Sequence, residues 1–182
     1  MTKNPLTDAL DVYLDLGRRP YTEVVSQLEH ALQCAWLAER ESGDGDLVAA
    51  AFLHDIGHMM QKHGQDAADR GINDKHEAIA RGWAERHFNA RVAQAVGLHV
   101  EAKRYLCATR PGYFETLSPA SVTSLELQGG PMSDAEVKAF EAQPHYQDAV
   151  KVREWDDRAK VAGLETPDID HFRPYMESAL AA

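Results

Sequence analysis

The sequence predicts an all-α fold, a bundle of helices, and three observations support this class. Apolar residues recur at helical spacing along most of the chain, whereas strand-like alternation is weak. Glycine and proline punctuation falls mainly at 109–119 and 129–131, which leaves long helical segments on either side. The length of 182 residues is typical of one domain, so we expect 1–182 to form a single unit.

The first three helices are marked by their ends. One covers about 5–16 and ends at Gly17. The next begins near Thr22 and runs to about residue 40, where the glycine-containing turn 42–45 stops it. Asp46 is a suitable N-cap for a third helix over 47–60, whose alanines and leucines favour helix.

Further helical patterns occupy 75–88, 90–108, 133–143, 145–162 and 168–180. Ser133 and Glu136 have the spacing of a capping box, so the start of their helix is well marked. The long connection over 109–131 is predicted to form a functional wall, because structureless loops of that length are uncommon in compact domains.

Charge and composition exclude several kinds of partner. The chain has 19 basic and 29 acidic residues, a net charge of -10, which argues against a nucleic-acid partner. Its longest apolar run, 47–53, is far shorter than the about 20 residues of a membrane helix. Cys34 and Cys107 show no pairing pattern and fit reduced thiols, so we expect a cytoplasmic protein without a membrane partner.

Nine histidines are the unusual feature of the composition, and His54-Asp55 stands at the end of the apolar run. Burying an ionised aspartate beside a histidine is costly unless each has a strong partner, and a metal ion is one. His30, His76 and His99 lie on the neighbouring predicted helices, 22–24 residues apart along the series, and Asp156 follows on a later helix. Helix bundles build metal sites from facing helices in this way.

These residues make six nitrogen and oxygen ligands, more than a single ion usually needs. Two ions sharing Asp55 as a bridge would use all six, and imidazole with carboxylate suits iron, manganese or zinc. The alternative is that several of these histidines are ordinary core or surface residues.

The series resembles the HD-domain superfamily over nearly the whole chain, and His76 with His99 matches its dinuclear branch. The segments 27–30, 54–58, 99–103, 117–121, 125–131 and 153–156 resemble the small HD-domain oxygenases that cleave a carbon–phosphorus bond with a mixed-valent di-iron centre. This resemblance implies two iron ions, Fe(II) and Fe(III), with O2 as co-substrate and a small phosphonate as substrate. It implies His30, His54 and Asp156 on one iron, His76 and His99 on the other, and Asp55 between them.

The resemblance also implies roles around the metals. Lys103, Ser121 and Arg153 match the phosphonate-binding positions, and His58 matches a proton-handling histidine. A dianionic phosphonate needs local cations in a chain of this net charge, which supports the lysine and arginine independently. The alternative is that both are solvated helix positions, and that His58 caps a helix end.

One departure from the family's pattern predicts the methylation state of the substrate's amine. The glycine-forming relatives carry a tyrosine at the position of Pro20, whereas here Tyr21 follows one place later and Glu23 keeps the family's glutamate. We therefore expect the trimethylammonium substrate, which yields glycine betaine and phosphate, with Tyr21 and Glu23 at the cation. Three further aromatic residues are possible contacts: Tyr105, Tyr113 and Phe114. The alternatives are the glycine-forming reaction of the free amine, a dinuclear phosphohydrolase, and a catalytically silent ligand-binding module.

Overall fold

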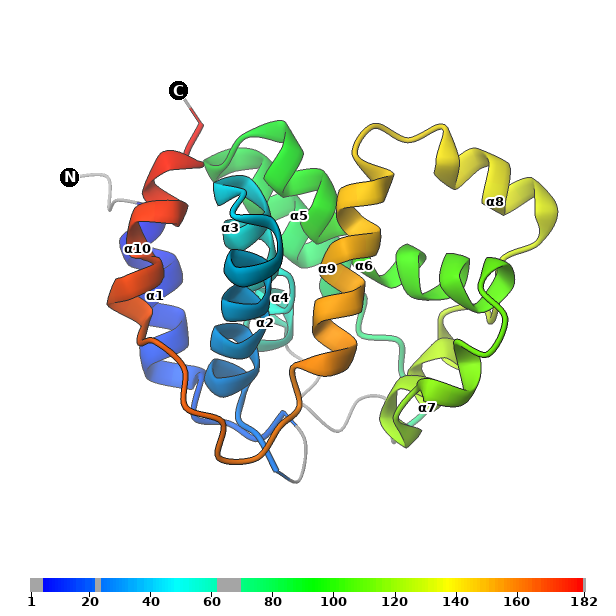
Figure 1. The fold of residues 1–182 in the computed structure, drawn as a ribbon, viewed down its shortest axis with the longest axis horizontal. Helices are drawn as coiled ribbons and strands as arrows, with labels where there is room; N and C mark the ends of the chain where they lie inside the picture. The colour runs from blue at the N-terminus through cyan, green and yellow to red at the C-terminus, as the bar shows by residue number, and fades with distance from the viewer. Residues whose placement is uncertain (1–4, 22–23, 62–69, 182) are drawn as a thin grey trace.

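The computed structural model describes residues 5–21, 24–61 and 70–181, and helices make up most of them (Figure 1). In chain order they are α1 (Pro5–Leu16), α2 (Gln27–Ser42), α3 (Gly45–Leu53), α4 (Ile56–Met60), α5 (His76–His87), α6 (Ala90–Thr109), a 3-10 turn (Phe114–Thr116), α7 (Pro119–Leu127), α8 (Asp134–Glu141), α9 (Tyr146–Arg158) and α10 (Ile169–Ser178). Within these residues, β-type pairing is limited to two isolated bridges. The predicted all-α class is confirmed.

Helix α3 forms the centre of the core. Every residue from Leu47 to Leu53 is at most 1% exposed, and α2, α6, α9 and α10 pack around this helix. Figure 1 shows α8 on the far side of α6 and α9 from α1 and α10, and a smaller apolar cluster that includes Phe140 joins α8 to α6. The carboxyl end of α3 therefore delivers His54 and Asp55 into the interior.

The predicted single helix over 47–60 is wrong, because it breaks at the His54-Asp55 pair. Asp55 has φ -100° and ψ 8°, a sparsely populated backbone region that turns the chain between α3 and α4. The predicted cap is also wrong: the carboxylate of Asp44 accepts from the backbone N–H groups of Asp46 and Leu47. Asp46 instead accepts from the side-chain amide of Asn89 at 2.9 Å.

Helix α2 starts later than predicted. Thr22 and Glu23 lie outside the described residues, and 24–26 are not helical. Ser26 and Glu29 form a capping box, in which each side chain accepts from the other's backbone N–H, so α2 begins at Gln27. This box lies immediately before His30 and fixes the position of that ligand candidate.

The rest of the structure differs from the predicted helices in two places. The connection over 109–131 contains α7, which Ser118 caps and which has Pro119 at its first position, where proline is favoured. The helix predicted over 145–162 ends at Arg158. The Ser133–Glu136 capping box is confirmed, and the other predicted helices end within about two residues of their predicted limits, as is usual for helix ends.

Gly57 allows α4 to approach the start of α5 closely. A Cβ atom at this position would lie 2.0 Å from the carbonyl oxygen of His76 and 3.1 Å from its Cα atom. Only glycine fits such a contact, because real Cβ atoms do not approach backbone that closely. The contact places His76 beside Asp55.

Cys34 and Cys107 are free cysteines in the structure, Cys34 buried and Cys107 partly exposed. No helix among the described residues is long and apolar enough to cross a membrane.

Candidate metal centre

The six predicted ligands come from different elements and meet in the interior of the protein. His30 comes from α2, the His54-Asp55 pair from the turn after α3, and His76 from the first position of α5. His99 comes from the middle of α6, and Asp156 from the last turn of α9. All six are buried, with at most 6% of each residue exposed.

The first group of atoms surrounds one oxygen of Asp55. Its Oδ2 atom lies 3.5 Å from Nε2 of His30 and 3.3 Å from Nε2 of His54. The two imidazole nitrogens are 3.3 Å apart, and Oδ1 of Asp156 lies 3.4 Å from Nε2 of His30. Four candidate donors therefore face a common point.

The second group surrounds the other oxygen of the same carboxylate. Oδ1 of Asp55 lies 3.5 Å from Nε2 of His76 and 3.3 Å from Nε2 of His99. These two nitrogens are 3.2 Å apart. Asp55 therefore presents one oxygen to each group, as a bridging ligand does.

Hydrogen bonds on the far side of each ring determine which nitrogen is available to a metal. The Nδ1 atoms of His30, His54 and His99 donate to the backbone carbonyls of Ala159, Ala51 and Val96 at 2.8, 2.8 and 2.6 Å. Nδ1 of His76 donates to Oδ1 of Asp74 at 2.8 Å. A neutral imidazole that donates through Nδ1 keeps a lone pair on Nε2, so four lone pairs converge on the two groups.

The donor set fits two bound metal ions. Two ligand atoms bound about 2.1 Å from one ion lie about 3.0–3.4 Å apart at ordinary coordination angles, and the Nε2 atoms in each group are 3.3 and 3.2 Å apart. Without a cation or an added proton, these lone pairs would repel one another. Cys34 approaches His30 Nε2 at 3.6 Å, but burial raises the pKa of its thiol well above the usual value, which makes it a poor ligand.

Both carboxylates are held in the ionised form that metal binding needs. Burial opposes ionisation of Asp55, but the surrounding imidazoles, His54 foremost, hold its pKa well below the usual value. Burial likewise opposes ionisation of Asp156, and Arg153 with Lys160 outweighs it and lowers that pKa. The pKa values of His30 and His76 are lowered mainly by burial, which favours the neutral rings that bind metals.

Asp156 lies in a network of cations and a phenol. Arg153 Nη1 donates to its Oδ2 atom at 2.7 Å, and Lys160 donates to its Oδ1 atom at 2.9 Å. Tyr21 stacks on the ring of His30, with ring centroids 3.9 Å apart, and its hydroxyl donates to the same Oδ1 atom at 3.3 Å. Tyr21 therefore supports the first metal group.

His58 lies next to the second group. Its ring stacks on His76 with centroids 3.7 Å apart, and its Nδ1 atom donates to Oδ2 of Asp74 at 2.8 Å. Its Nε2 atom lies 3.8 Å from Oδ1 of Asp55. One aspartate, Asp74, thus orients both a ligand candidate and the neighbouring histidine.

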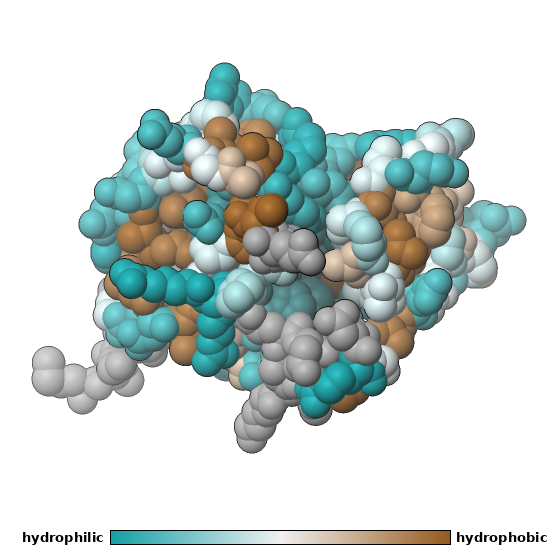
Figure 2. Space-filling model, turned by 90° about the horizontal axis from the view of Figure 1, so that it is seen from below, coloured by the Kyte–Doolittle hydropathy of each residue, from teal (hydrophilic) through white to brown (hydrophobic). Residues whose placement is uncertain are grey.

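A cavity of about 160 Å³ opens onto these atoms. Lys103, Ser121 and Arg153 all line it, together with Tyr21 and His58. The view from below, the side of α7 and the chain before α2, shows a hollow near the middle of this face with hydrophilic residues inside it (Figure 2). The structure therefore brings the predicted ligands and the predicted phosphonate-binding residues to one cavity.

The two predicted cationic residues are not solvated helix positions. Lys103 is 2% exposed and Arg153 is 4% exposed. Lys103 Nζ donates to the hydroxyl of Ser124 at 2.7 Å, and burial followed by repulsion from Arg153 lowers its pKa to about 7. Arg153 pairs through Nε and Nη2 with Asp157, so part of its guanidinium is held by carboxylates.

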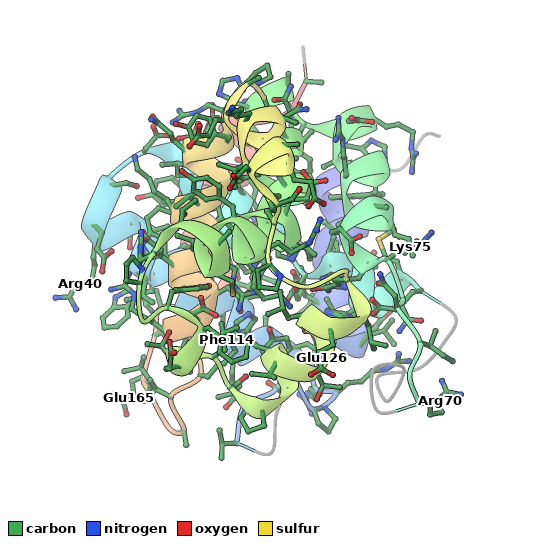
Figure 3. All side chains as sticks on the ribbon, turned by 90° about the vertical axis from the view of Figure 1, so that its right-hand side faces the viewer. Arg40, Arg70, Lys75, Phe114, Glu126 and Glu165 are labelled. Carbon is green, nitrogen blue, oxygen red and sulfur yellow. The ribbon has the colours of Figure 1, made fainter. Side chains whose placement is uncertain are left out.

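The three further aromatic residues suggested as amine contacts do not line this cavity. Tyr105 packs on Phe140, and the hydroxyl of Tyr113 donates to Asp157 on another face of Arg153. Phe114, labelled in Figure 3, is 44% exposed at the surface. Tyr105, in α6, belongs to the smaller apolar cluster, whereas the connection before α7 directs Tyr113 toward Arg153 and leaves Phe114 at the surface. Glu23 lies outside the described residues.

Sequence reasoning missed several polar residues of the site. Asp74 stands two residues before His76, Ser124 one helical turn after Ser121, and Lys160 one turn after Asp156. Ser124 and Lys160 thus follow a predicted site residue by three or four positions, the spacing of one helical turn. An acidic residue just before a ligand histidine is a signal for its orienting partner.

Comparisons with known proteins agree with this arrangement. The HD domain model matches residues 28–142. The hydroxymethylphosphonate dioxygenase of Gimesia maris is 41% identical over 184 residues, which cover 99% of this chain and 92% of that protein. The glycine-betaine-forming [1-hydroxy-2-(trimethylamino)ethyl]phosphonate dioxygenase of Leisingera caerulea is 42% identical over 155 residues, which cover 85% of this chain and 79% of that protein.

Proposed function

Because this chain belongs to the HD-domain family and is similar over most of its length to phosphonate dioxygenases, we propose that it uses O2 to cleave the carbon–phosphorus bond of a 1-hydroxyphosphonate. The chain is an oxidoreductase of the phosphonate-cleaving HD type. The observation that carries the proposal is the position of Asp55, whose two oxygens face two separate groups of imidazole nitrogens at the floor of a cavity with two buried cations.

The residues proposed to hold the metals are those of the two groups. His30, His54 and Asp156 would bind one iron, His76 and His99 the other, and Asp55 both. When bound as an Fe(II)/Fe(III) pair, the irons would supply O2 activation and an anchor for the substrate's oxygens. The carbonyls and carboxylate behind the imidazoles keep each Nε2 directed at its ion.

The chain's own contribution is to bind and orient the phosphonate. Lys103 contributes a point charge and Arg153 a planar donor, and both are buried, so their attraction for a dianion is little screened. The hydroxyls of Ser121 and Ser124 lie along the same wall. Holding the phosphorus end in this way directs carbon 1 toward the metal groups and excludes water.

His58 is proposed to handle a proton at its Nε2 atom. Nδ1 is committed to Asp74 at 2.8 Å, so Nε2 is the nitrogen that faces Asp55 and the cavity. Burial lowers the pKa of His58, but the carboxylates of Asp74 and Asp55 outweigh burial and raise it. A ring of this kind accepts a proton readily near neutral pH.

We propose (R)-1-hydroxy-2-(trimethylamino)ethylphosphonate as the substrate, with glycine betaine and phosphate as products. The relative of that activity and the displaced tyrosine at position 21 support this choice. The second candidate is hydroxymethylphosphonate, which the other relative's name specifies. One observation favours it. The aspartates that line the cavity, Asp55, Asp74 and Asp156, are already paired with histidines or cations, and hydroxymethylphosphonate has no ammonium group that would need a carboxylate partner.

Turnover of the candidate substrates side by side tests the proposal. Iron-loaded protein is given the trimethylammonium compound, its free-amine analogue and hydroxymethylphosphonate in air, and phosphate release is measured. We expect the trimethylammonium compound to be preferred over the free amine by at least about tenfold in kcat/KM, because the primary ammonium leaves its N–H groups unpaired. Preference for the free amine would assign the glycine-forming reaction, and phosphate from none of them would contradict the function.

The low pKa of Lys103 predicts a pH dependence. The cationic form binds the phosphonate, and the fraction of it falls as the pH rises through about 7. Since kcat/KM reports groups of the free enzyme, we expect it to fall about tenfold or more between about pH 7 and 9. Lys103→Arg keeps its charge over this range, so its kcat/KM should not fall, whereas Lys103→Ala should have a low kcat/KM at every pH. If kcat/KM falls equally in wild type and Lys103→Arg, another group causes the pH dependence.

A further inference from the structure

The side-chain carbonyl oxygen of Gln27 is buried and unpaired. Gln27 is the first residue of α2 and only 4% exposed, and its Oε1 atom has no hydrogen-bond partner among the residues that the structure describes. It lines the cavity and stands one helical turn before His30, on the same helix face. Neither the metal groups nor the cations Lys103 and Arg153 account for it.

A second buried glutamine of the same helix shows the usual arrangement. Gln33 is 2% exposed, and its Nε2 atom donates to the carbonyl of Val161 at 2.8 Å. Its Oε1 atom accepts from the backbone N–H of Val161 at 3.0 Å. Both ends of that amide stabilise the fold, as is the rule for buried polar groups. The unpaired oxygen of Gln27 is an exception to this rule. Of the four such side-chain atoms among the described residues, those of Gln27 and Gln128 belong to residues that line the cavity.

The chemistry of the amide oxygen selects its ligand. A carbonyl oxygen accepts, so the ligand must present a hydrogen, which a dianionic phosphonate and a trimethylammonium nitrogen do not carry. The hydroxyl on carbon 1 carries one, and it is common to both candidate substrates. We infer that Gln27 accepts a hydrogen bond from the 1-hydroxyl of the substrate and thereby selects 1-hydroxyphosphonates over phosphonates that lack this group. The inference rests on the proposed function.

The test compares two ligands that differ in that hydroxyl. Dissociation constants are measured without O2 on iron-loaded protein, for the trimethylammonium substrate and for its 1-deoxy analogue. We expect Gln27→Leu to weaken the hydroxyl compound about tenfold, the usual size of one buried hydrogen bond, and the deoxy analogue less than about twofold. Its iron content should stay at the wild-type level, and its melting temperature should not fall, because an unsatisfied oxygen is removed.

Gln33→Leu is the matched control from the same helix. It should lower the melting temperature, because the backbone of Val161 loses both partners, and leave the two dissociation constants in their wild-type ratio. Gln128 lines the cavity from the end of α7, and its Oε1 atom is also unpaired within the described part of the chain, so it supplies a second comparison.

Three outcomes would overturn the inference: equal weakening of both ligands by Gln27→Leu, no weakening of either, or a selective loss in Gln128→Leu instead. These outcomes are separable from failure of the proposed function itself. That failure would appear as wild-type protein that releases no phosphate from any of the three compounds in air.

Discussion

Asp55→Ala is expected to lose nearly all bound metal and to reduce activity by at least about a thousandfold. The carboxylate faces both donor groups, with Oδ2 at 3.3 Å from His54 Nε2 and Oδ1 at 3.3 Å from His99 Nε2. Its removal takes a ligand from both ions and leaves two cations to repel each other without a shared anion. A metal centre contributes several kcal/mol to a transition state, which corresponds to a loss of this size.

Metal analysis of the purified variant measures this effect directly. Glu85→Ala is the control, because it removes an exposed carboxylate that pairs with Arg81 one helical turn away. It should retain the wild-type metal content. Two ions per chain in Asp55→Ala would contradict the bridging role.

Gly57→Ala is expected to damage the second metal group while leaving the first in place. The added methyl would lie 2.0 Å from the carbonyl oxygen of His76, so the start of α5 must move and carry that ligand away from Asp55. The contact is with backbone, which cannot rotate aside as a side chain does. We expect the metal content to fall from two ions per chain to about one, with activity reduced at least about a hundredfold, as displacement of a ligand commonly does.

Gly82→Ala, within α5 itself, is the matched control. A Cβ atom there would have only Arg86 Nη1 near it, at 3.9 Å. Alanine is preferred over glycine inside a helix, so this variant should be more stable by up to about 1 kcal/mol and keep both ions. Full metal content and activity in Gly57→Ala would show that α5 does not depend on this close contact.

The ligand set could be predicted from the sequence because each predicted helix of the series carries one of its histidines. His30, His54, His76 and His99 recur at nearly constant spacing, and helices of a bundle bring such positions together. The bridging geometry of Asp55 could not be predicted as well, because it depends on a break between two helices that helix propensity does not indicate. Alanine and leucine dominate 47–60, and the turn at His54-Asp55 is set by tertiary contacts.

The surroundings of the metal groups were predicted less well than the ligands. Tyr21 was expected at the substrate's amine, and in the structure its hydroxyl donates to Asp156 at 3.3 Å. Tyr113 was expected near the amine and instead supports Arg153 through Asp157. Side chains in connections are placed by the packing of distant elements, so their direction does not follow from local spacing.

The ratio of O2 consumed to phosphate released tests the central claim most directly. Iron-loaded protein is mixed with its best substrate in a sealed oxygen-electrode chamber, and phosphate is determined in the same sample. A dioxygenase that cleaves the carbon–phosphorus bond should consume one O2 for each phosphate, and release should stop when the chamber is made anaerobic. Phosphate release that continues at the same rate without O2 would contradict the account and assign a hydrolytic reaction to the same residues.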